Sequence, residues 1–470
     1  MSILKSKWLR RGLLFCAGLL CALVIYGLLQ LIEPVRIAPI FDNSTVQFTG
    51  EALLIASDAD MVATAYGDAN LDRVPGVEDT LTRVELALNA EQPAVATVPV
   101  SNSVMSWPQV IAVSPDGQRA YVVETRARPE DGINKLEDID QMPAGSRLTV
   151  VDISRRSQPT VVESVDVGRN PEHISISPNG EFLAVNLDEP GRELLIVELQ
   201  PDGRLGLRTY ISMQSDLTAS GTASGTASGD MREDNQTAIW HPSGQYMAIV
   251  QGQNRQVGLY RVQSTDDAVS VDAMGDPLVV GNYLSNPRFT SDGRFLLVPD
   301  LKWGLYGDSI LSYLLNTSGE MIALEFDPEA EDPFRLVSRV KVGLSPEGFA
   351  LSPDNSLLAT VNMRRTYLPR FLPAWRGKPY SSLSLVQFDP LTGQLNTIEE
   401  YGFEGLLPEQ ATFDASGNAI AVVVFNYREP MPEEGAVEFW NVVKGASPRL
   451  ERTGYRLDVV RGAHDIVLVP

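Results

Sequence analysis

One hairpin pattern recurs along the chain and constrains its fold more than any other feature. In the run from Pro171 to Asn186, alternating apolar residues lead into a Ser-Pro-Asn-Gly turn that begins at Ser177, and a second alternating stretch follows. Alternation with a period of two on both sides of such a turn predicts a β-hairpin. Six turns of this kind begin at Ser114, Ser177, His241, Thr290, Ser352 and Asp414.

A second predicted hairpin follows the first in these units, so that each unit supplies four antiparallel strands. Clear examples of the second hairpin begin at Leu148, Leu194, Met321 and Leu383. The turns recur at intervals of 49 to 64 residues. Four-stranded units repeated at such a period are typical of the blades of a β-propeller.

The first and last parts of residues 50–470 supply one further unit. The run from Ala463 to Pro470 resembles an innermost strand without a partner, and the run from Glu51 to Tyr66 resembles a unit that lacks this strand. Joining them closes the ring and removes the exposed sheet edges that invite aggregation. We therefore predict an all-β fold, a seven-bladed β-propeller over residues 50–470 that is closed by its N- and C-terminal strands in one blade. The spacing favours seven blades over six or eight.

Two of the units carry a more specific order of residues. In Val165–Asn186 and Val340–Asn362, a Val-x-Val-Gly segment is followed by a proline, by a Ser-Pro turn with Asp or Asn, and by a strand that ends in Asn. This order resembles the YVTN-type repeat of seven-bladed cell-surface propellers and of lactonase-like propellers. The resemblance covers the body from residue 50 to residue 470. It implies a fold that hosts many activities.

The amino end has the features of a membrane anchor. Lys5, Lys7, Arg10 and Arg11 precede an uncharged apolar run over residues 12–32. About 20 apolar residues are needed to span a bilayer, and basic residues favour the cytoplasmic side. We predict a cytoplasmic segment 1–11, a transmembrane signal anchor 12–32, a linker 33–49 and an extracytoplasmic body, which is periplasmic if the source is bacterial. A cleaved secretion signal is the alternative.

Charge and cysteine content exclude several classes of function. The net charge of the chain is −22, and because the first 33 residues carry +3, the remaining residues carry −25. Such an acidic body repels phosphate backbones, which argues against nucleic-acid binding. Both cysteines, Cys16 and Cys21, lie in the apolar run. The body therefore has no disulfide, no thiol nucleophile, no thiolate metal site and no covalently attached haem.

Carboxylates and histidines are predicted at one mouth of the central channel. Glu172 and His173 follow a proline at the start of an innermost strand, and other units place Glu347 and Glu409 in the same way. His464, with Asp465, closes this ring of polar residues. Close carboxylates raise each other's pKa, which suits general acid–base catalysis. The candidate catalytic residues are Glu172, His173, Glu347, Glu409 and His464; the alternative is that they cap strand ends and hold channel water.

The resemblance to lactonase-like propellers bears on this mouth. Those proteins carry a Gly-Pro-Arg-His segment where this chain has Asn170-Pro171-Glu172-His173. The proline and the histidine match, which supports a role for His173. Glu172 replaces an arginine that could hold a carboxylate or phosphate, and this replacement argues against lactone hydrolysis.

Two loop segments carry further candidate binding residues. Between Met363 and Ser381, cationic and aromatic side chains alternate, and Arg and Trp are favoured anchors for anions, sugars and partner proteins. The candidates for this site are Arg364, Arg365, Tyr367, Arg370, Trp375 and Arg376, extended by Lys302 and Trp303. The alternative is a loop that folds over the ring, with its arginines paired to neighbouring acids.

The second segment has the spacing of a calcium loop. Asp68, Asn70, Asp72 and Asp79 could supply oxygen ligands, although Arg73 stands where such loops require glycine. A solvated acidic loop is the alternative, so no cofactor is required and calcium is an option.

These features favour a non-catalytic module of the cell envelope that is held to the membrane by its N-terminal helix. It would bind a protein, a carbohydrate or another small molecule. The alternative function is a lactonase-like hydrolase of sugar or related lactones, which would act through the channel-mouth residues.

Overall fold

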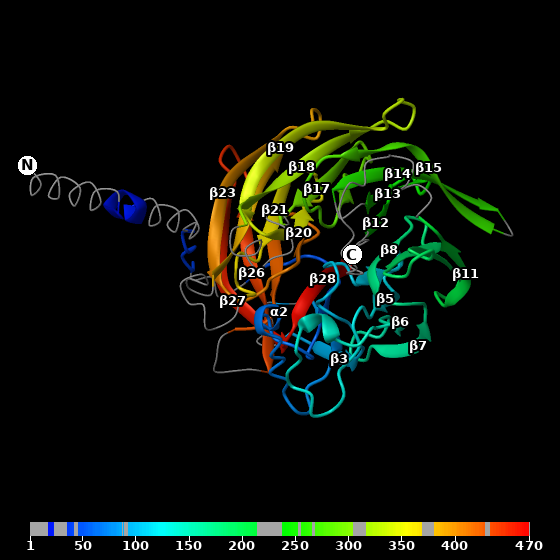
Figure 1. Cartoon of the computed structure of the whole chain (residues 1–470), viewed down its shortest axis with the longest axis horizontal. Helices are drawn as coiled ribbons and strands as arrows, with labels where there is room; N and C mark the ends of the chain where they lie inside the picture. The colour runs from blue at the N-terminus through cyan, green and yellow to red at the C-terminus, as the bar shows by residue number, and fades with distance from the viewer. Residues whose placement is uncertain are drawn as a thin grey trace, which may run out of the picture.

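The computed structural model describes residues 17–22, 35–41, 46–86, 88, 93–213, 237–251, 255–265, 268–303, 316–368, 380–427 and 433–469. Within them the chain forms seven four-stranded antiparallel sheets arranged as the blades of a ring (Figure 1). The predicted seven-bladed propeller is therefore confirmed. In these same residues no helix is long and apolar enough to cross a membrane. The predicted helix 12–32 lies outside the described residues, except for a short helical stretch over 17–22.

One blade is built from both ends of the chain, as the sequence predicted. Its strands, from the channel outward, are β28 (Ala463–Val469), β1 (Ala52–Ser57), β2 (Thr80–Glu85) and β3 (Val95–Pro99). Ala52 pairs with Val469, and Leu54 pairs with Val467. Figure 1 shows β28, in red, towards the middle of the molecule.

The other six blades follow one another along the chain, each from its innermost to its outermost strand. The first two comprise β4 (Ile111–Val113), β5 (Arg119–Val123), β6 (Arg147–Asp152) and β7 (Thr160–Asp166), then β8 (Pro171–Ile176), β9 (Phe182–Leu187), β10 (Leu194–Leu199) and β11 (Leu205–Ile211). The next two comprise β12 (Thr237–Trp240), β13 (Tyr246–Gln251), β14 (Gln256–Thr265) and β15 (Ala268–Val279), then β16 (Arg288–Phe289), β17 (Phe295–Asp300), β18 (Ser318–Phe326) and β19 (Phe334–Leu344). The last two comprise β20 (Pro346–Leu351), β21 (Leu357–Asn362), β22 (Tyr380–Phe388) and β23 (Leu395–Glu404), then β24 (Ala411–Phe413), β25 (Ala419–Val424), β26 (Glu434–Val443) and β27 (Arg449–Val460). Two short helices, α2 (Ala65–Asp68) and η1 (Ile139–Gln141), lie in loops.

The hydroxyl group that begins four of the six predicted turns, at Ser114, Ser177, Thr290 and Ser352, explains why these turns form where they do. Ser352 Oγ accepts a hydrogen bond from Leu357 N at 3.0 Å and donates to Asp354 Oδ1 at 2.7 Å. Ser177 makes the equivalent contacts with Phe182 N and Asn179. These bonds satisfy turn backbone that cannot pair within a sheet.

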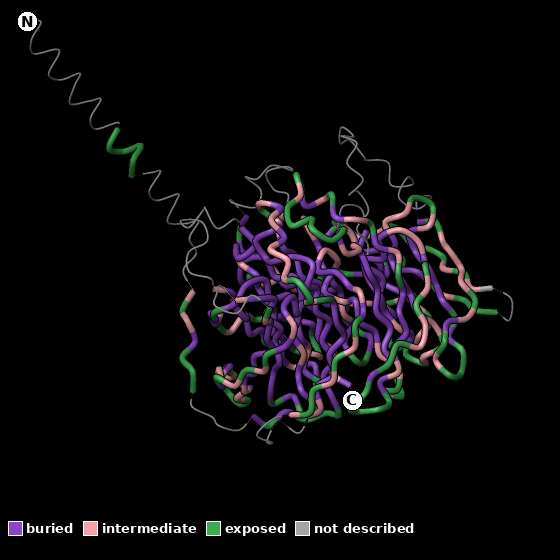
Figure 2. The backbone as a smooth tube through the Cα atoms, turned by 90° about the horizontal axis from the view of Figure 1, so that it is seen from below, coloured by how far each residue is buried: buried purple, intermediate pink, exposed green. Residues whose placement is uncertain are grey.

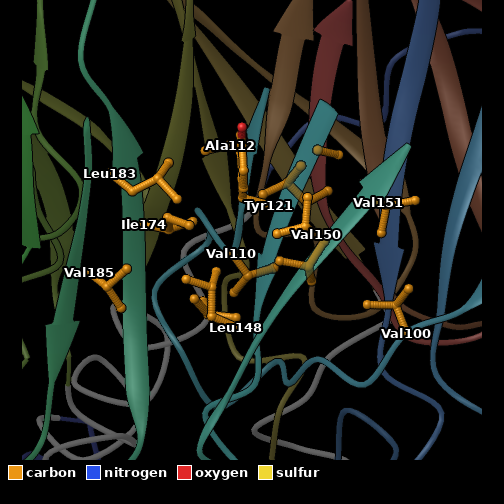
Figure 3. Packing of buried hydrophobic residues seen from close by; sticks show 14 of the residues in the cluster. Val100, Val110, Ala112, Tyr121, Leu148, Val150, Val151, Ile174, Leu183 and Val185 are labelled. Carbon is orange, nitrogen blue, oxygen red and sulfur yellow. The ribbon is translucent and has the colours of Figure 1, made fainter. Parts of the chain in front are cut away.

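The core lies between facing blades. In Figure 3, Val110, Tyr121 and Leu148 of one blade pack near Ile174 and Leu183 of the next. All are almost fully buried. Burying such a side chain contributes about 1.5–3 kcal/mol, so every interface between blades stabilises the ring. Figure 2 shows the same arrangement across the molecule, with buried segments inside and exposed segments along the outer edges.

The described part of the predicted linker is attached to the outside of the ring. Ile37 pairs with Gly402 of β23, and Ile40 pairs with Arg452 of β27, both in parallel. The backbone bonds Ala38 N to Gly402 O and Phe41 N to Arg452 O are 2.8 and 2.9 Å long. Residues 35–41 therefore join the outermost strands of two neighbouring blades.

Candidate functional site

The structure buries all five predicted catalytic residues at the start of innermost strands. Glu172 and Glu347 are the second residues of β8 and β20, His464 is the second residue of β28, and Glu409 lies just before β24. Each of the five is at most 8 % exposed. The strands of one blade alternate in direction, so these positions lie at one end of the channel.

Glu409 and His464 are brought face to face. His464 Nδ1 lies 3.9 Å from Glu409 Oε2, and neither atom has a hydrogen-bond partner among the described residues. Burial lowers the pKa of His464 to about 3, so that the imidazole is neutral. Burial and the negative charges of Glu347, Asp58 and Asp465 raise the pKa of Glu409 well above its ordinary value. The contact therefore joins a neutral histidine to a carboxyl group whose pKa is raised.

Glu347 completes a carboxyl pair with Glu409. Burial raises the pKa of Glu347 to about 8, and its charge acts on Glu409. The two innermost strands approach closely here, because a Cβ at Gly348 would lie 2.2 Å from the carbonyl oxygen of Glu409. Two interacting carboxyl groups titrate as a pair, so that near neutral pH at least one of them holds a proton.

Glu172 and His173 lie apart from this pair, on β8 across the ring. Burial lowers the pKa of His173 to about 3, and both of its ring nitrogens lack a hydrogen-bond partner within the described chain. The backbone carbonyl of Glu172 accepts a hydrogen bond from Trp107 N at 3.3 Å. The five predicted residues thus divide into a close group of three and a second group of two.

Tyr66 belongs to the site but was not among the predicted residues. Its hydroxyl group donates to Val104 O at 3.0 Å. Burial and the charges of Glu409 and Glu347 raise its pKa, which places the phenol near both carboxyl groups. It comes from the long loop between β1 and β2, where a single aromatic residue carries no recognisable signal.

Arg288 is a second residue that sequence analysis missed. It begins β16, remains partly exposed, and lies with its guanidinium carbon 5.7 Å from the centre of the Phe349 ring. Burial lowers its pKa, whereas the charge of Asp465 raises it. Within the described ranges, no carboxylate oxygen comes within the 4.0 Å of an ion pair with it. It therefore places an incompletely neutralised positive charge in the channel.

Asp465 is held by the neighbouring blade. Its Oδ2 accepts hydrogen bonds from Val110 N and Ile111 N, both at 2.9 Å. Burial raises its pKa to about 6, although these bonds and Arg288 act in the opposite direction. Two backbone donors leave Asp465 little freedom to rotate towards Arg288.

Loops from several blades form an apolar cap on the same face. They connect second to third strands or link successive blades, and their apolar residues form one cluster. This apolar cap includes Met61, Leu71, Val104, Trp107, Leu301, Tyr367, Leu407 and Phe425. Leu407 precedes Glu409 by two residues, and Tyr66 packs against the cluster. The cap and the low exposure of the carboxyl pair mean that the site is closed in this conformation.

The cationic and aromatic residues that were predicted to bind a ligand or partner, where the structure describes them, make contacts within the chain. Lys302 pairs with Glu320 at 2.6 Å, Arg364 pairs with Glu400 at 3.2 Å, and Arg365 donates to Asn316 O at 3.0 Å. Trp303 donates to Ser345 Oγ at 3.0 Å, and the rings of Trp303 and Tyr367 lie 5.7 Å apart. These contacts agree with the alternative of a loop folded over the ring. Arg370, Trp375 and Arg376 lie outside the described residues.

The structure does not gather the predicted calcium ligands into one site. Asp79 lies with Asp58 and Asp60, whose carboxylate oxygens come within 4.8 Å of one another. Among the residues that can be placed, Asp68 and Asp72 do not form such a group with Asp79. Asp68 Oδ1 accepts a hydrogen bond from Asn70 N at 3.0 Å, and Asn70 itself bridges to Lys135. Asp79 lies directly before β2, at the far end of the loop from Asp58 and Asp60, and not with Asp68 and Asp72.

The three carboxylates that do come together are satisfied by protein groups. Ala59 N donates to Asp79, and Val104 N donates to Asp58, both at 2.9 Å. Arg128 pairs with Asp60 at 3.0 Å, and Arg73 and Arg461 add positive charge nearby. We call Asp58, Asp60 and Asp79 the aspartate clasp, because they fix both ends of the loop between β1 and β2. Three arginines balance its charge, so the donor set does not favour calcium.

A groove of about 470 Å³ lies elsewhere, at the outer edges of β23 and β27. Its polar groups are engaged with one another. Tyr427 donates to Glu438 Oε1 at 2.8 Å, and Arg452 donates to both oxygens of Glu438. The carboxyl pair at the channel mouth therefore remains the better candidate for chemistry.

Comparison with known proteins shows similarity of fold at low sequence identity. No family model and no curated protein matches the chain. Among solved structures, a "putative 6-phosphogluconolactonase" of Bacteroides uniformis is similar at 15 % identity and a TM-score of 0.56, covering 89 % of this chain and 99 % of that one. A protein of the same description from Bacteroides fragilis has 13 % identity and a TM-score of 0.60, with 91 % and 100 % covered. The periplasmic gluconolactonase of Pseudomonas aeruginosa has 18 % identity and a TM-score of 0.57, with 89 % and 99 % covered. The chain is thus a seven-bladed β-propeller with the fold of the lactonase-like propellers.

Proposed function

We propose that the chain hydrolyses a sugar lactone or a related lactone at the mouth of its channel. The observation that carries this proposal is the buried carboxyl pair Glu347–Glu409, whose pKa values are both raised. Around the pKa of Glu347, about 8, such a pair can hold one proton and one negative charge. It can therefore supply a base and an acid in the same site.

Hydrolysis of a lactone needs both a carboxylate and a carboxylic acid. The carboxylate accepts a proton from water as the water oxygen adds to the lactone carbonyl carbon. The carboxylic acid then donates its proton to the ring oxygen as the bond between that oxygen and the carbonyl carbon breaks. The product is a hydroxy acid, and the carboxyl pair still holds one proton, now on the other member. Proton transfer of this kind typically contributes 10²–10⁴-fold to a rate.

Arg288 supports the proposal by supplying a cation. The segment from Asn170 to His173 lacks the arginine of lactonase-like propellers, but Arg288 places a positive charge in the channel from another blade. Such a charge can hold an acidic substituent or stabilise the oxyanion that forms at the carbonyl. The similar structures from Bacteroides uniformis and Pseudomonas aeruginosa are described as lactonases, which supports the same class of substrate. The apolar run over residues 12–32 supports a body that is anchored at the membrane and acts outside the cytoplasm.

The test follows acid release by the full-length chain in a pH-stat, with a panel of sugar and aliphatic lactones. We expect turnover that falls at least 100-fold in kcat for Glu347→Gln and for Glu409→Gln, as expected for the loss of an acid–base group. Glu172→Gln is the matched control, since Glu172 occupies the same strand position and is as buried as Glu347, at 8 %. Absence of turnover on every lactone, or equal losses in all three variants, would overturn the assignment.

A binding module is the second candidate, and the closed site favours it. The apolar cap leaves the carboxyl pair at most 8 % exposed, which suits retention of a ligand more than rapid exchange. In that case the lactones or their hydroxy acids would raise the melting temperature of the full-length chain without being consumed. The same panel, measured by thermal shift, separates the two functions.

A further inference from the structure

Asn102 lies in the link between β3 and β4 and has a fixed amide orientation. Its Nδ2 donates to Val100 O at 2.9 Å and to Ser57 O at 3.2 Å, with Thr80 O at 3.4 Å. Only an amide nitrogen can donate to carbonyl oxygens, so the surrounding backbone identifies which end of the side chain is which. Asn102 Oδ1 must then be the atom that lies 2.8 Å from His464 Nε2.

This contact fixes the tautomer of His464. An amide oxygen can only accept a hydrogen bond, so Nε2 carries the hydrogen. A neutral imidazole then keeps a lone pair on Nδ1, which is the atom that lies 3.9 Å from Glu409 Oε2. Both facing atoms are buried and have no other partner in the described part of the chain. Nδ1 can therefore act towards Glu409 only as an acceptor.

We propose that Asn102, by holding His464 as the Nε2–H tautomer, assigns the proton of the carboxyl pair to Glu409 and leaves Glu347 as the base. Asn102 is a positioning residue here, since it acts through His464 and touches neither carboxyl group of the pair. The inference rests on the proposed function for its catalytic meaning. The proton placement itself is a property of the free protein.

The geometry requires one small movement. A hydrogen bond from a carboxylic acid to an imidazole nitrogen needs a separation of about 2.7–3.2 Å, and the atoms are 3.9 Å apart. Rotation of the Glu409 carboxyl group about its side-chain bonds closes this gap. If Glu409 were ionised, its oxygen would face a lone pair instead, with no hydrogen between them. The fixed tautomer therefore favours the acid form of Glu409 over the carboxylate.

The other charged groups that face Glu409 also favour its protonated form. Glu347 from β20, Asp465 from β28 and Asp58 after β1 all place negative charge near it. Tyr66, from the loop between β1 and β2, is also close and is uncharged at neutral pH. Within the described part of the chain, no imidazole faces Glu347 as His464 faces Glu409. Burial alone accounts for the raised pKa of Glu347.

The test uses the full-length chain labelled with ¹⁵N in its histidine rings, of which there are only three. We expect the His464 signals to show hydrogen on Nε2 and none on Nδ1, without change between pH 5 and pH 8 (the range in which an ordinary histidine titrates). A carboxylic-acid band in the infrared spectrum at pH 9, where Glu347 has lost its proton, that disappears in Glu409→Gln would place the proton directly. Hydrogen on Nδ1, or a band that disappears in Glu347→Gln and persists in Glu409→Gln, would overturn the inference.

Variants at Asn102 then test its role. Asn102→Leu removes the acceptor, so we expect the second tautomer to appear, the Glu409 band to weaken, and the upper limb of the pH–rate profile to move down by about one pH unit. Asn102→Asp keeps an acceptor at the same place and should retain the Nε2–H tautomer. This variant tests the role of residue 102 if Asn102→Leu does not fold. Asn186→Leu beside His173 is the control and should leave the His464 signals unchanged. A pH profile and a Glu409 band that are the same in Asn102→Leu and the wild type would contradict the proposal.

The two proposals fail separately. The tautomer and the acid band are measured without substrate, so a chain that turns over no lactone can still show both. That result would overturn the proposed function alone. An active lactonase with the wrong tautomer would overturn the role of Asn102 alone.

Discussion

Gly348 and Glu409 lie so close that a Cβ at residue 348 would sit 2.2 Å from the carbonyl oxygen of Glu409. A contact under 3.0 Å to backbone cannot be relieved by turning a side chain, so Gly348→Ala must push β20 away from β24. We expect this variant to lose about 1–3 kcal/mol of unfolding free energy, as is usual for overpacking. Its lactone turnover should fall at least tenfold, because the carboxyl pair is separated.

The control for this change is Gly206→Ala on the outermost strand β11, where the nearest backbone atom lies 3.0 Å away. Chemical denaturation and the pH-stat assay measure the two effects. Equal turnover in Gly348→Ala and the wild type would show that the spacing of these strands does not matter to the site.

The raised pKa of Glu347 gives a prediction for stability against pH. Its pKa is about 8 in the folded chain and 4.5 in its ordinary state. Between these values the unfolded chain releases the proton and the folded chain keeps it, so the folded state loses stability as the pH rises through this window. Glu347→Gln cannot ionise and escapes this loss.

We therefore expect Glu347→Gln to stabilise the chain more at pH 8 than at pH 5, by on the order of a few kcal/mol. Denaturant titrations of the two proteins at both pH values measure the difference. The same stability gain at pH 5 and pH 8 would contradict a raised pKa at this residue.

Arg461 is fully buried beneath the aspartate clasp. It donates to Asp72 O at 2.6 Å and to Ala59 O at 2.9 Å, and its charge acts on Asp58 and Asp60. Arg461→Leu removes the buried one of the three arginines that balance these carboxylates, and removing one partner from buried charges typically costs about 3–5 kcal/mol. Arg449→Leu, which removes an exposed pair with Glu451, should cost no more than about 1 kcal/mol. Denaturation midpoints of both variants test the contrast, and similar losses would argue against a structural role for the clasp.

Calcium should have little effect on stability. The clasp carboxylates accept backbone hydrogen bonds and face three arginines, so a divalent ion would have to displace protein partners. We expect millimolar calcium or a chelator to change the melting temperature by no more than about 1 °C. A larger rise with calcium that vanishes in Asp79→Asn would show that the ion binds the clasp after all.

The sequence predicted the ring because its signals are local. Alternation, turn residues and the two half-units at the ends are each visible within about 20 residues, and the propeller follows from repeating them. Glu347, Glu409 and His464 could be proposed for the same reason, since each occupies one fixed position in its repeat. The repeat did not show that Glu172 and His173 lie apart from them.

Other parts of the site come from outside the repeat. Asn102 sits in a link between blades, Tyr66 sits in a long loop, and Arg288 lies two residues before its turn, whereas Glu347 and Glu409 lie five residues before theirs. Each reaches the site through folding of the whole ring, which leaves no pattern in the nearby sequence. The calcium prediction differs in kind. It relied on spacing along the chain, whereas Asp79 is paired in space with residues about 20 positions earlier.

The pairing of Ala52 with Val469 also sets an order of events during synthesis. Six blades have all their strands in sequence and can form one after another, but the blade that begins at β1 lacks its innermost strand until β28 is made. Contacts between such distant residues form slowly, and an unpaired strand edge is prone to associate with other chains. We expect the partly synthesised protein to form an open arc of blades, in which the edge of β1 that later pairs with β28 is exposed. Pairing of the seven-residue strand β28 with β1 then closes this arc of blades into a ring.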